Sequence, residues 1–212
     1  MTPRTTERFT IAGPAGALEL VINPPARAPC GIALVAHPNP VQGGTLDNKV
    51  AQTLARALHG LGYASVRFNF RGVGHSEGSF DDGIGETDDA LAALAHARER
   101  FGHVLPVVLA GFSFGCYVQS RVAQRISAQR LVLVGPAVGR FPVAAVPADT
   151  LVIHGEQDDV VPLADVFAWA RPQQLPIVVF PGCGHFFHGR LPQLAATIAS
   201  VWHGRPPVPP GA

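Results

Sequence analysis

The feature that most constrains the fold is an alternation of short apolar runs with longer amphipathic segments. A short apolar run bounded by turn residues is typical of a buried strand, and a longer amphipathic segment is typical of a helix. When the two alternate along a chain, the expected product is a mostly parallel sheet covered by helices on both faces. The sequence therefore predicts an α/β fold with a doubly wound sheet of about eight strands.

The expected elements can be located by residue number. The strands are expected at residues 9–12, 18–22, 31–36, 64–70, 106–110, 130–134, 150–154 and 176–180. The first two of these strands are expected to form an antiparallel hairpin at the edge of the sheet. The helices are expected at residues 46–58, 86–100, 114–126, 162–169 and 191–202.

The length of the chain, 212 residues, fits one large domain, which we expect over residues 1–204. Half of the residues in 205–212 are proline, a composition that predicts an extended, mobile tail. With 47% hydrophobic and 15% charged residues, nothing indicates global disorder.

Charge and cysteine content exclude several classes of protein. The net charge is +1 and no block of like charges occurs, so we expect neither nucleic-acid nor membrane binding. The N-terminus has no apolar segment of the kind found in signal peptides. The three cysteines, Cys30, Cys116 and Cys183, are widely spaced, which argues against a disulfide framework or a zinc ribbon and favours a reducing cytoplasm.

The segment Gly111-Phe-Ser113-Phe-Gly115 matches the pattern G-x-S-x-G between an apolar strand and a helix. This context is the one in which the pattern forms a sharp turn that exposes a serine at the end of a strand. The two glycines are expected where the chain crowds together before and after the turn. Ser113 is therefore the candidate nucleophile, and the backbone N–H of Phe114, at the start of the next helix, can stabilise an oxyanion.

A serine hydroxyl needs a base at neutral pH, and the base needs an acid that orients it. Asp158 follows the strand at 150–154, and we favour it over its neighbour Asp159, since the two cannot both point at one imidazole. His185 lies in a glycine-rich loop after the last strand and is the candidate base. Ser113, Asp158 and His185 occur in the order Ser–Asp–His, each after its own strand.

Taken together, the segments AHPNP (36–40), RFNFRGVGHS (67–76), GFSFG (111–115), HGEQDDVVP (154–162) and GCGHFF (182–187) resemble the α/β-hydrolase superfamily. Residues 43–49 are similar to a branch of small, lidless bacterial hydrolases. The resemblance implies a second oxyanion N–H from the loop after the strand at 31–36. Because Pro38 and Pro40 have no N–H, Asn39 is the expected donor, with Val41 as the alternative.

The segment between the strands at 130–134 and 150–154 is too short for the helical cap that many members of this superfamily carry. We therefore expect no cap domain and an open, shallow cleft. Phe112, Phe186 and Phe187 flank the candidate residues and are expected to line a site for a small apolar acyl or alcohol group. For Phe112 a place in the core is an equal alternative.

The function expected on these grounds is hydrolysis of small carboxylic esters or thioesters through an acyl-enzyme, with no cofactor and no metal. The expected partner is a small-molecule ester, and the chain is expected to be a monomer or a homodimer. Two alternatives remain open at this point. One is a serine peptidase or amidase acting on small substrates, and the other is a non-enzymatic binding module on a hydrolase scaffold.

Overall fold

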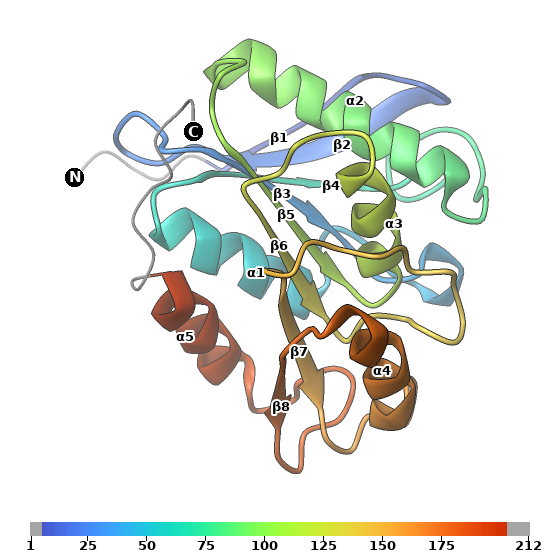
Figure 1. Cartoon of the computed structure of the whole chain (residues 1–212). Helices are drawn as coiled ribbons and strands as arrows, with labels where there is room; N and C mark the ends of the chain where they lie inside the picture. Colours follow the sequence, from blue (N-terminus) through green and yellow to red (C-terminus); the bar gives the residue numbers. More distant parts are fainter. Residues whose placement is uncertain (1–5, 203–212) are drawn as a thin grey trace.

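The computed structural model describes residues 6–202, and these residues form one eight-stranded sheet in the order β1-β2-β4-β3-β5-β6-β7-β8 (Figure 1). The strands are β1 (Glu7–Gly13), β2 (Gly16–Asn23), β3 (Ile32–Ala36), β4 (Ala64–Phe68), β5 (Val107–Phe112), β6 (Arg130–Val134), β7 (Leu151–Gly155) and β8 (Ile177–Phe180). The predicted doubly wound, mostly parallel sheet is confirmed.

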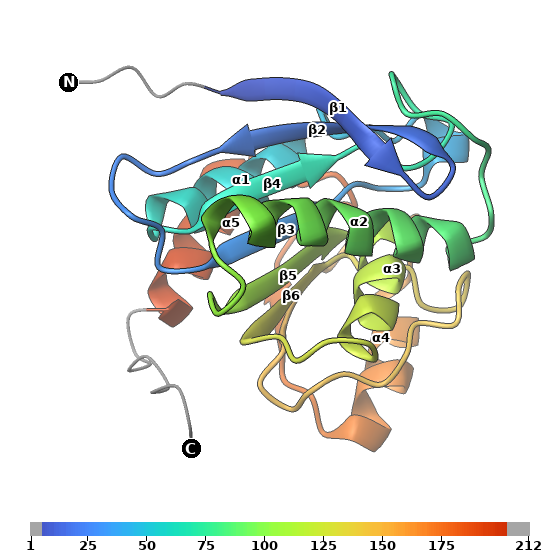
Figure 2. The same ribbon diagram turned by 90° about the horizontal axis from the view of Figure 1, so that it is seen from above.

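The opening hairpin lies at one edge of this sheet, as predicted (Figure 2). β1 pairs with β2 in antiparallel register, from Glu7 opposite Ile22 to Gly13 opposite Gly16. β2 also runs antiparallel to β4, whereas every pair from β4 to β8 is parallel. The carboxyl ends of β3, β5, β7 and β8 therefore point to the same edge, where ligands of open α/β sheets bind.

Helices cover both faces of the sheet and enclose two apolar cores (Figure 1). One core lies between the sheet and α2, α3 and α4, and the other lies between the sheet and α1 and α5. The central strands are buried along their whole length, which explains why they read as continuous apolar runs in the sequence. The helices are α1 (Lys49–Gly60), α2 (Ile84–Phe101), α3 (Phe114–Ala123), α4 (Leu163–Ala170) and α5 (Leu191–Trp202), with short 3-10 turns η1 (Pro40–Gln42) and η2 (Arg171–Gln173).

Helix α1 begins three residues later than the periodicity of the sequence predicts. Asn48 caps the helix, because its side chain accepts hydrogen bonds from the N–H groups of Val50 and Ala51. Leu46 is buried but not helical, since its N–H donates to Oδ1 of Asn69, 2.8 Å away. The periodicity of apolar residues extended the predicted helix to Leu46, because this residue is apolar. Leu46 is apolar because it is buried, and not because it is helical.

The segment between β6 and β7 contains no helix or strand, so no cap covers this edge of the sheet. The segment instead packs onto α3, where the ring of Phe141 stacks on Tyr117 with centroids 5.4 Å apart. No helix in the described residues is long and apolar enough to cross a bilayer. The tail expected at 205–212 lies outside the residues that the structure describes.

Candidate active site

Ser113 lies in the turn between β5 and α3 with an unusual backbone conformation, φ 54° and ψ −117°. A residue other than glycine at positive φ costs on the order of 1–3 kcal/mol and needs support from its surroundings. The N–H of Ser113 donates to the carbonyl oxygen of Val134 on β6 at 2.9 Å, and its own carbonyl oxygen accepts from the N–H of Cys116 at 2.9 Å. These two bonds hold the serine at the carboxyl edge of the sheet, as predicted for a sharp strand-to-helix turn.

The two glycines that flank this turn permit close backbone contacts. A Cβ atom on Gly111 would lie 2.5 Å from the carbonyl oxygen of Gly115. A Cβ atom on Gly115 would lie 2.4 Å from the carbonyl oxygen of Ala36, at the end of β3. Because both obstacles are backbone atoms that cannot move aside, no larger residue fits, and α3 begins directly over the end of β3.

The structure brings His185 and Asp158 together from the loops after β8 and β7. Nδ1 of His185 lies 2.7 Å from Oδ2 of Asp158, and both side chains are buried. The other carboxylate oxygen, Oδ1, accepts the N–H groups of Val160 and Val161 at 3.0 and 2.7 Å. Asp159, the rival in the sequence, is exposed and makes no such contact.

The pKa of Asp158 lies below its ordinary value of 3.8. Burial by itself would raise this pKa, but the hydrogen bonds from His185 and from the Val161 N–H lower it further than burial raises it. The carboxyl group is therefore ionised at neutral pH and accepts the proton on Nδ1 of His185. This arrangement leaves Nε2 of His185 as the basic nitrogen.

A second histidine, His154, lies beside the same carboxylate. It is fully buried on β7, its Nε2–H donates to the carbonyl oxygen of Val161 at 2.9 Å, and Nε2 is 3.4 Å from Oδ2 of Asp158. Burial lowers the pKa of His154, which keeps its ring neutral. In the sequence, His154 was only a histidine at the end of a strand. The one signal that could have indicated its contact with Asp158 is that the two residues are four positions apart.

The ring of His185 is positioned by packing as well as by Asp158. It lies over Phe112, with ring centroids 4.9 Å apart, and close to Gly135 on the loop after β6. A Cβ atom on residue 135 would lie 3.2 Å from Cε1 of His185, and this residue has φ 55°. Glycine at this position therefore leaves the space that the imidazole ring occupies.

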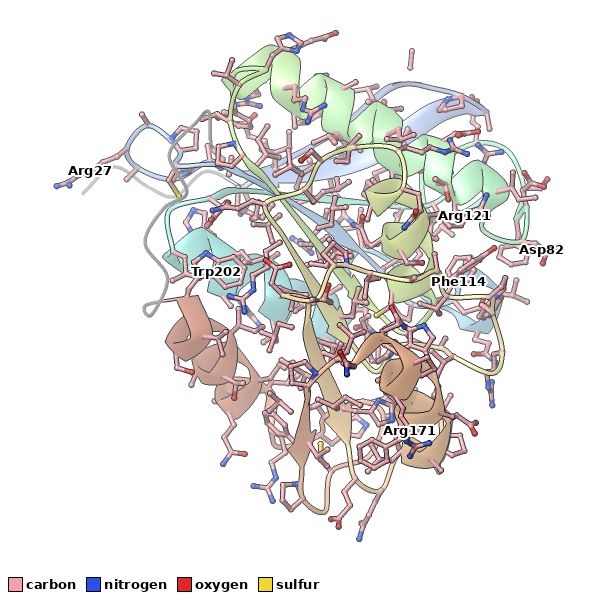
Figure 3. All side chains as sticks on the ribbon, in the orientation of Figure 1. Arg27, Asp82, Phe114, Arg121, Arg171 and Trp202 are labelled. Carbon is pink, nitrogen blue, oxygen red and sulfur yellow. The ribbon has the colours of Figure 1, made fainter. Side chains whose placement is uncertain are left out.

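The backbone N–H groups of Phe114, in the first turn of α3 (Figure 3), and of Asn39, after β3, have no acceptor among the described residues. The N–H of Val41, the alternative to Asn39, donates to Oδ1 of Asn39 at 2.9 Å. Of the two donors that the sequence left open, only Asn39 therefore has a free N–H.

His37 links the loop that carries Asn39 to the segment just after β4. This ring is fully buried, its Nδ1–H donates to the carbonyl oxygen of Pro38 at 2.7 Å, and its Nε2 accepts the N–H of Phe70 at 3.1 Å. Burial lowers the pKa of His37 to about 3, so the ring is neutral at neutral pH. Sequence reasoning gave no role to His37, because its partner Phe70 is distant in the sequence, in the segment that follows β4.

Phe112 takes the core position that the sequence left open, and the expectation that Phe187 lines a substrate site is wrong. Phe112 and Phe187 have no exposed surface and belong to the core between the sheet and α1 and α5. The ring of Phe112 packs against the ring of His185. Phe187, whose backbone has φ 53°, packs against Phe180. Phe186 is 47% exposed and lies edge-on to His185, so it remains the candidate substrate contact.

The two cysteines near Ser113 and His185 offer no competing nucleophile. Cys116 and Cys183 are buried, and burial raises the pKa of both thiols. The Cys116 thiol lies 3.1 Å from the carbonyl oxygen of Gly111 and 3.3 Å from that of Val134, where it packs beneath the serine turn. Within residues 6–202, no cluster of His, Cys, Asp and Glu has the arrangement of a metal site.

A doubly wound sheet with a strained serine between a central strand and the following helix defines a class of protein. The strand order, the single antiparallel hairpin at the edge and the position of Ser113 at the end of β5 are those of the α/β hydrolases.

Comparisons with known proteins agree with this class. A family model described as "Serine aminopeptidase, S33" matches residues 41–148. An uncharacterized protein of Rickettsia prowazekii is 33% identical over 161 residues, which are 73% of this chain and 68% of that protein.

Two solved structures extend the comparison to nearly the whole chain. An α/β serine hydrolase homologue from Coxiella burnetii is 38% identical with a TM-score of 0.83, and the match covers 94% of this chain and 99% of that one. An α/β serine hydrolase without lid from Xanthomonas campestris is 37% identical with a TM-score of 0.89. That match covers 99% of this chain and 99% of that one. The chain therefore belongs to the α/β serine hydrolase family.

The close packing at Gly115 predicts the effect of adding one methyl group. Gly115→Ala forces a Cβ against the carbonyl oxygen of Ala36, and overpacking of this kind lowers the free energy of unfolding by about 1–3 kcal/mol. Urea unfolding measures this change. Gly60→Ala is the matched control, because a Cβ there meets nothing within 4 Å, and it should leave stability unchanged or raise it by up to about 1 kcal/mol. Equal effects of the two substitutions would contradict the tight contact.

The burial of His37 predicts a loss of stability in acid. The unfolded chain protonates this ring near its ordinary pKa of 6.5, whereas the folded protein does so only near 3. The contribution of His37 to the free energy of unfolding is therefore complete above pH 6.5. Below pH 6.5 this contribution falls by up to about 1.4 kcal/mol per pH unit. His154, whose pKa is also lowered, acts in the same direction.

Urea unfolding of the wild type and of His37→Asn, measured between pH 7.5 and 4.5, tests this prediction. The variant should be less stable at pH 7.5, because it loses a buried hydrogen-bonded ring, but its stability should fall less steeply with decreasing pH. Identical slopes would show that His37 is protonated as readily in the folded protein as in the unfolded chain.

Proposed function

We propose that this protein hydrolyses small carboxylic esters or thioesters, with Ser113 as nucleophile, His185 as general base and acid, and Asp158 as the group that orients His185. The observation that carries the proposal is the buried 2.7 Å contact between His185 and Asp158 at the edge of the sheet where Ser113 ends β5. A strained serine and a buried imidazole–carboxylate pair at the same edge of the sheet both cost stability, and neutral residues would serve a purely structural purpose better.

In the proposed reaction, Nε2 of His185 takes the proton of the Ser113 hydroxyl while Oγ bonds to the acyl carbon of the substrate. The tetrahedral intermediate then collapses, and the bond from the acyl carbon to the alcohol or thiol breaks. His185 gives its proton to that leaving group. A water molecule, deprotonated by the same imidazole, attacks the acyl-enzyme and releases the acid with Ser113 restored.

Asp158 fixes the tautomer of His185 in this scheme. Its ionised Oδ2 accepts the proton on Nδ1, so the lone pair that acts as base is on Nε2. Because Oδ1 is held by two N–H groups and His154 lies against Oδ2, the carboxylate cannot rotate away from His185. We propose His154 as a positioning residue, since it contacts Asp158 and not the substrate.

The N–H groups of Phe114 and Asn39 are the proposed oxyanion hole. Both lack an acceptor among the described residues, and the dipole of α3 adds positive potential at Phe114. Removal of one such donor typically slows a reaction about 100- to 1000-fold. Pro38 and Pro40 on either side of Asn39 restrict the loop. The loop is also held by His37, which accepts the N–H of Phe70, just after β4.

The substrate is proposed to be small. No cap covers the edge of the sheet, and the exposed Phe186 ring beside His185 offers an apolar contact for a short acyl or alcohol group. The protein is further proposed to act in the cytoplasm, a location favoured by three cysteines that form no disulfide.

A second candidate, hydrolysis of small aminoacyl amides, is favoured by one observation. The family model that matches residues 41–148 is described as a serine aminopeptidase. The same nucleophile and base would serve this reaction, so the two functions differ only in the bond that is cleaved. We favour esters because the chain has no cap that could hold a peptide in place.

Substitutions in the three proposed catalytic residues should have graded effects on the hydrolysis of short p-nitrophenyl esters. Ser113→Ala should abolish turnover, and Asp158→Asn should lower kcat by about 10⁴-fold, because the amide stabilises the wrong tautomer of His185. Cys183→Ala is the matched control, since it changes a buried residue two positions from His185 and should leave kcat/KM unchanged. Circular dichroism of each variant verifies folding. Substantial turnover by Ser113→Ala would disprove the mechanism.

A panel that pairs acetyl and butyryl esters with alanyl and leucyl p-nitroanilides separates the two candidate reactions. Higher kcat/KM for the esters, falling as the acyl chain lengthens, is expected. Faster cleavage of the anilides would identify an amidase instead. If neither series is hydrolysed, the chain is a binding module on a hydrolase scaffold.

A further inference from the structure

A cavity of about 300 Å³ lies between α1 and the edge where β2 pairs with β4. It is remote from Ser113, because none of its lining residues comes from β5, β7, β8 or the loops that follow them. Asn23 at the end of β2 pairs with Ser65 on β4, and both residues line the cavity. Its polar lining comprises Thr6, Asn23, Gln52, Arg56, His59, Ser65 and Arg67.

One face of α1 forms a wall of this cavity. Gln52, Ala55, Arg56 and His59 are spaced by three, four and seven residues, so they lie on the same side of the helix. The short side chain of Ala55 lies in the middle of this face and leaves room for a ligand. The Arg56 guanidinium group is steadied by Thr53 one turn earlier, at 3.3 Å from Nη2 to Oγ1.

The cavity is electropositive. Arg56 and Arg67 both line it, and among residues 6–202 no aspartate or glutamate does. The nearest carboxylate, Asp47, lies outside the lining, 3.5 Å from Nη1 of Arg67, and makes a closer contact of 2.6 Å with Arg8. The negative charge of Asp47 is therefore shared, and it neutralises Arg67 only in part.

Arg67 is incompletely bonded for a buried charged group. Its side chain comes from the middle of β4, and the residue is only 8% exposed. Nη1 donates to the carbonyl oxygen of Leu46 at 2.7 Å, but Nε is buried without an acceptor and Nη2 has none among the described residues. Burial lowers the pKa of this arginine, which reflects the cost of removing the charge from water.

We propose that this cavity binds the oxyanion group of a small polar molecule, a phosphate or a carboxylate, with Arg67 and Arg56 as its principal ligands. The planar guanidinium group presents parallel N–H donors that match two oxygens of either group. Nε2 of Gln52 donates to the carbonyl oxygen of Asp47 at 3.0 Å, and Nδ2 of Asn23 donates to Oγ1 of Thr6 at 2.7 Å. The amide oxygens of these two residues and the hydroxyl group of Ser65 suit a hydroxylated or otherwise polar remainder. The volume is at the lower end of the range for small-molecule sites.

Titration calorimetry with sodium phosphate, and separately with sodium succinate, tests this site in the full-length protein at constant ionic strength set by sodium chloride. Saturable binding of at least one anion is expected. Arg56→Gln should weaken that binding by about tenfold, the effect of losing one charged hydrogen bond. Arg56 is exposed and forms no salt bridge, so the variant should fold, whereas Arg67 supports the Leu46 carbonyl and is a poorer test.

Arg171→Gln is the matched control, because it removes an exposed arginine after α4, far from α1 (Figure 3), and should leave binding unchanged. Binding of phosphate alone would indicate a phosphorylated ligand, and binding of succinate alone a carboxylate. Absence of binding of both anions, or binding that is equal in the wild type and in Arg56→Gln, would overturn the proposal. Ester hydrolysis by Arg56→Gln should match that of the wild type. The anion site and the proposed catalytic function are therefore tested independently.

Discussion

The contact between Gly115 and the carbonyl oxygen of Ala36 is the constraint on which the candidate site depends. Only a residue without a side chain lets α3 begin so close to the end of β3. That approach forces the chain to turn sharply at Ser113, and the bonds of Ser113 to Val134 and Cys116 hold the strained turn. It also brings the free N–H of Phe114 next to the loop that carries Asn39.

The remaining groups reach the same edge because parallel strands end together. Asp158 follows β7 and His185 follows β8, and their side chains meet at 2.7 Å. Two buried, neutral histidines stiffen this edge: His154 lies against Asp158, and His37 links the loop after β3 to the segment just after β4. The two rings supply directional hydrogen bonds without adding a charge beside the ionised Asp158.

The sequence predicted the sheet, the opening hairpin and the meeting of Asp158 with His185, because each depends on short-range pattern or on the order of strands. It left Phe112 open between the site and the core and misjudged Phe187, since a residue next to a site can face either the ligand or the core, and only the backbone direction decides. The start of α1 was also misplaced, because Leu46 is buried through its bond to Asn69. The cavity beside Arg67 could not be predicted, as it arises where β2, β4 and α1 meet. The contacts of His37 and His154 likewise depend on backbone partners, the Phe70 N–H and the Val161 carbonyl, that local pattern does not reveal.

The central claim is that Ser113 is a nucleophile activated by the buried His185–Asp158 pair. Labelling with a fluorophosphonate probe at neutral pH tests it most directly, because Oγ displaces fluoride from phosphorus only if the serine is activated. Mass spectrometry of the digested protein should find one adduct, on Ser113, and labelling should be slowed strongly in His185→Gln. A protein that stays unlabelled, or one that carries its adduct on another residue, would contradict the account.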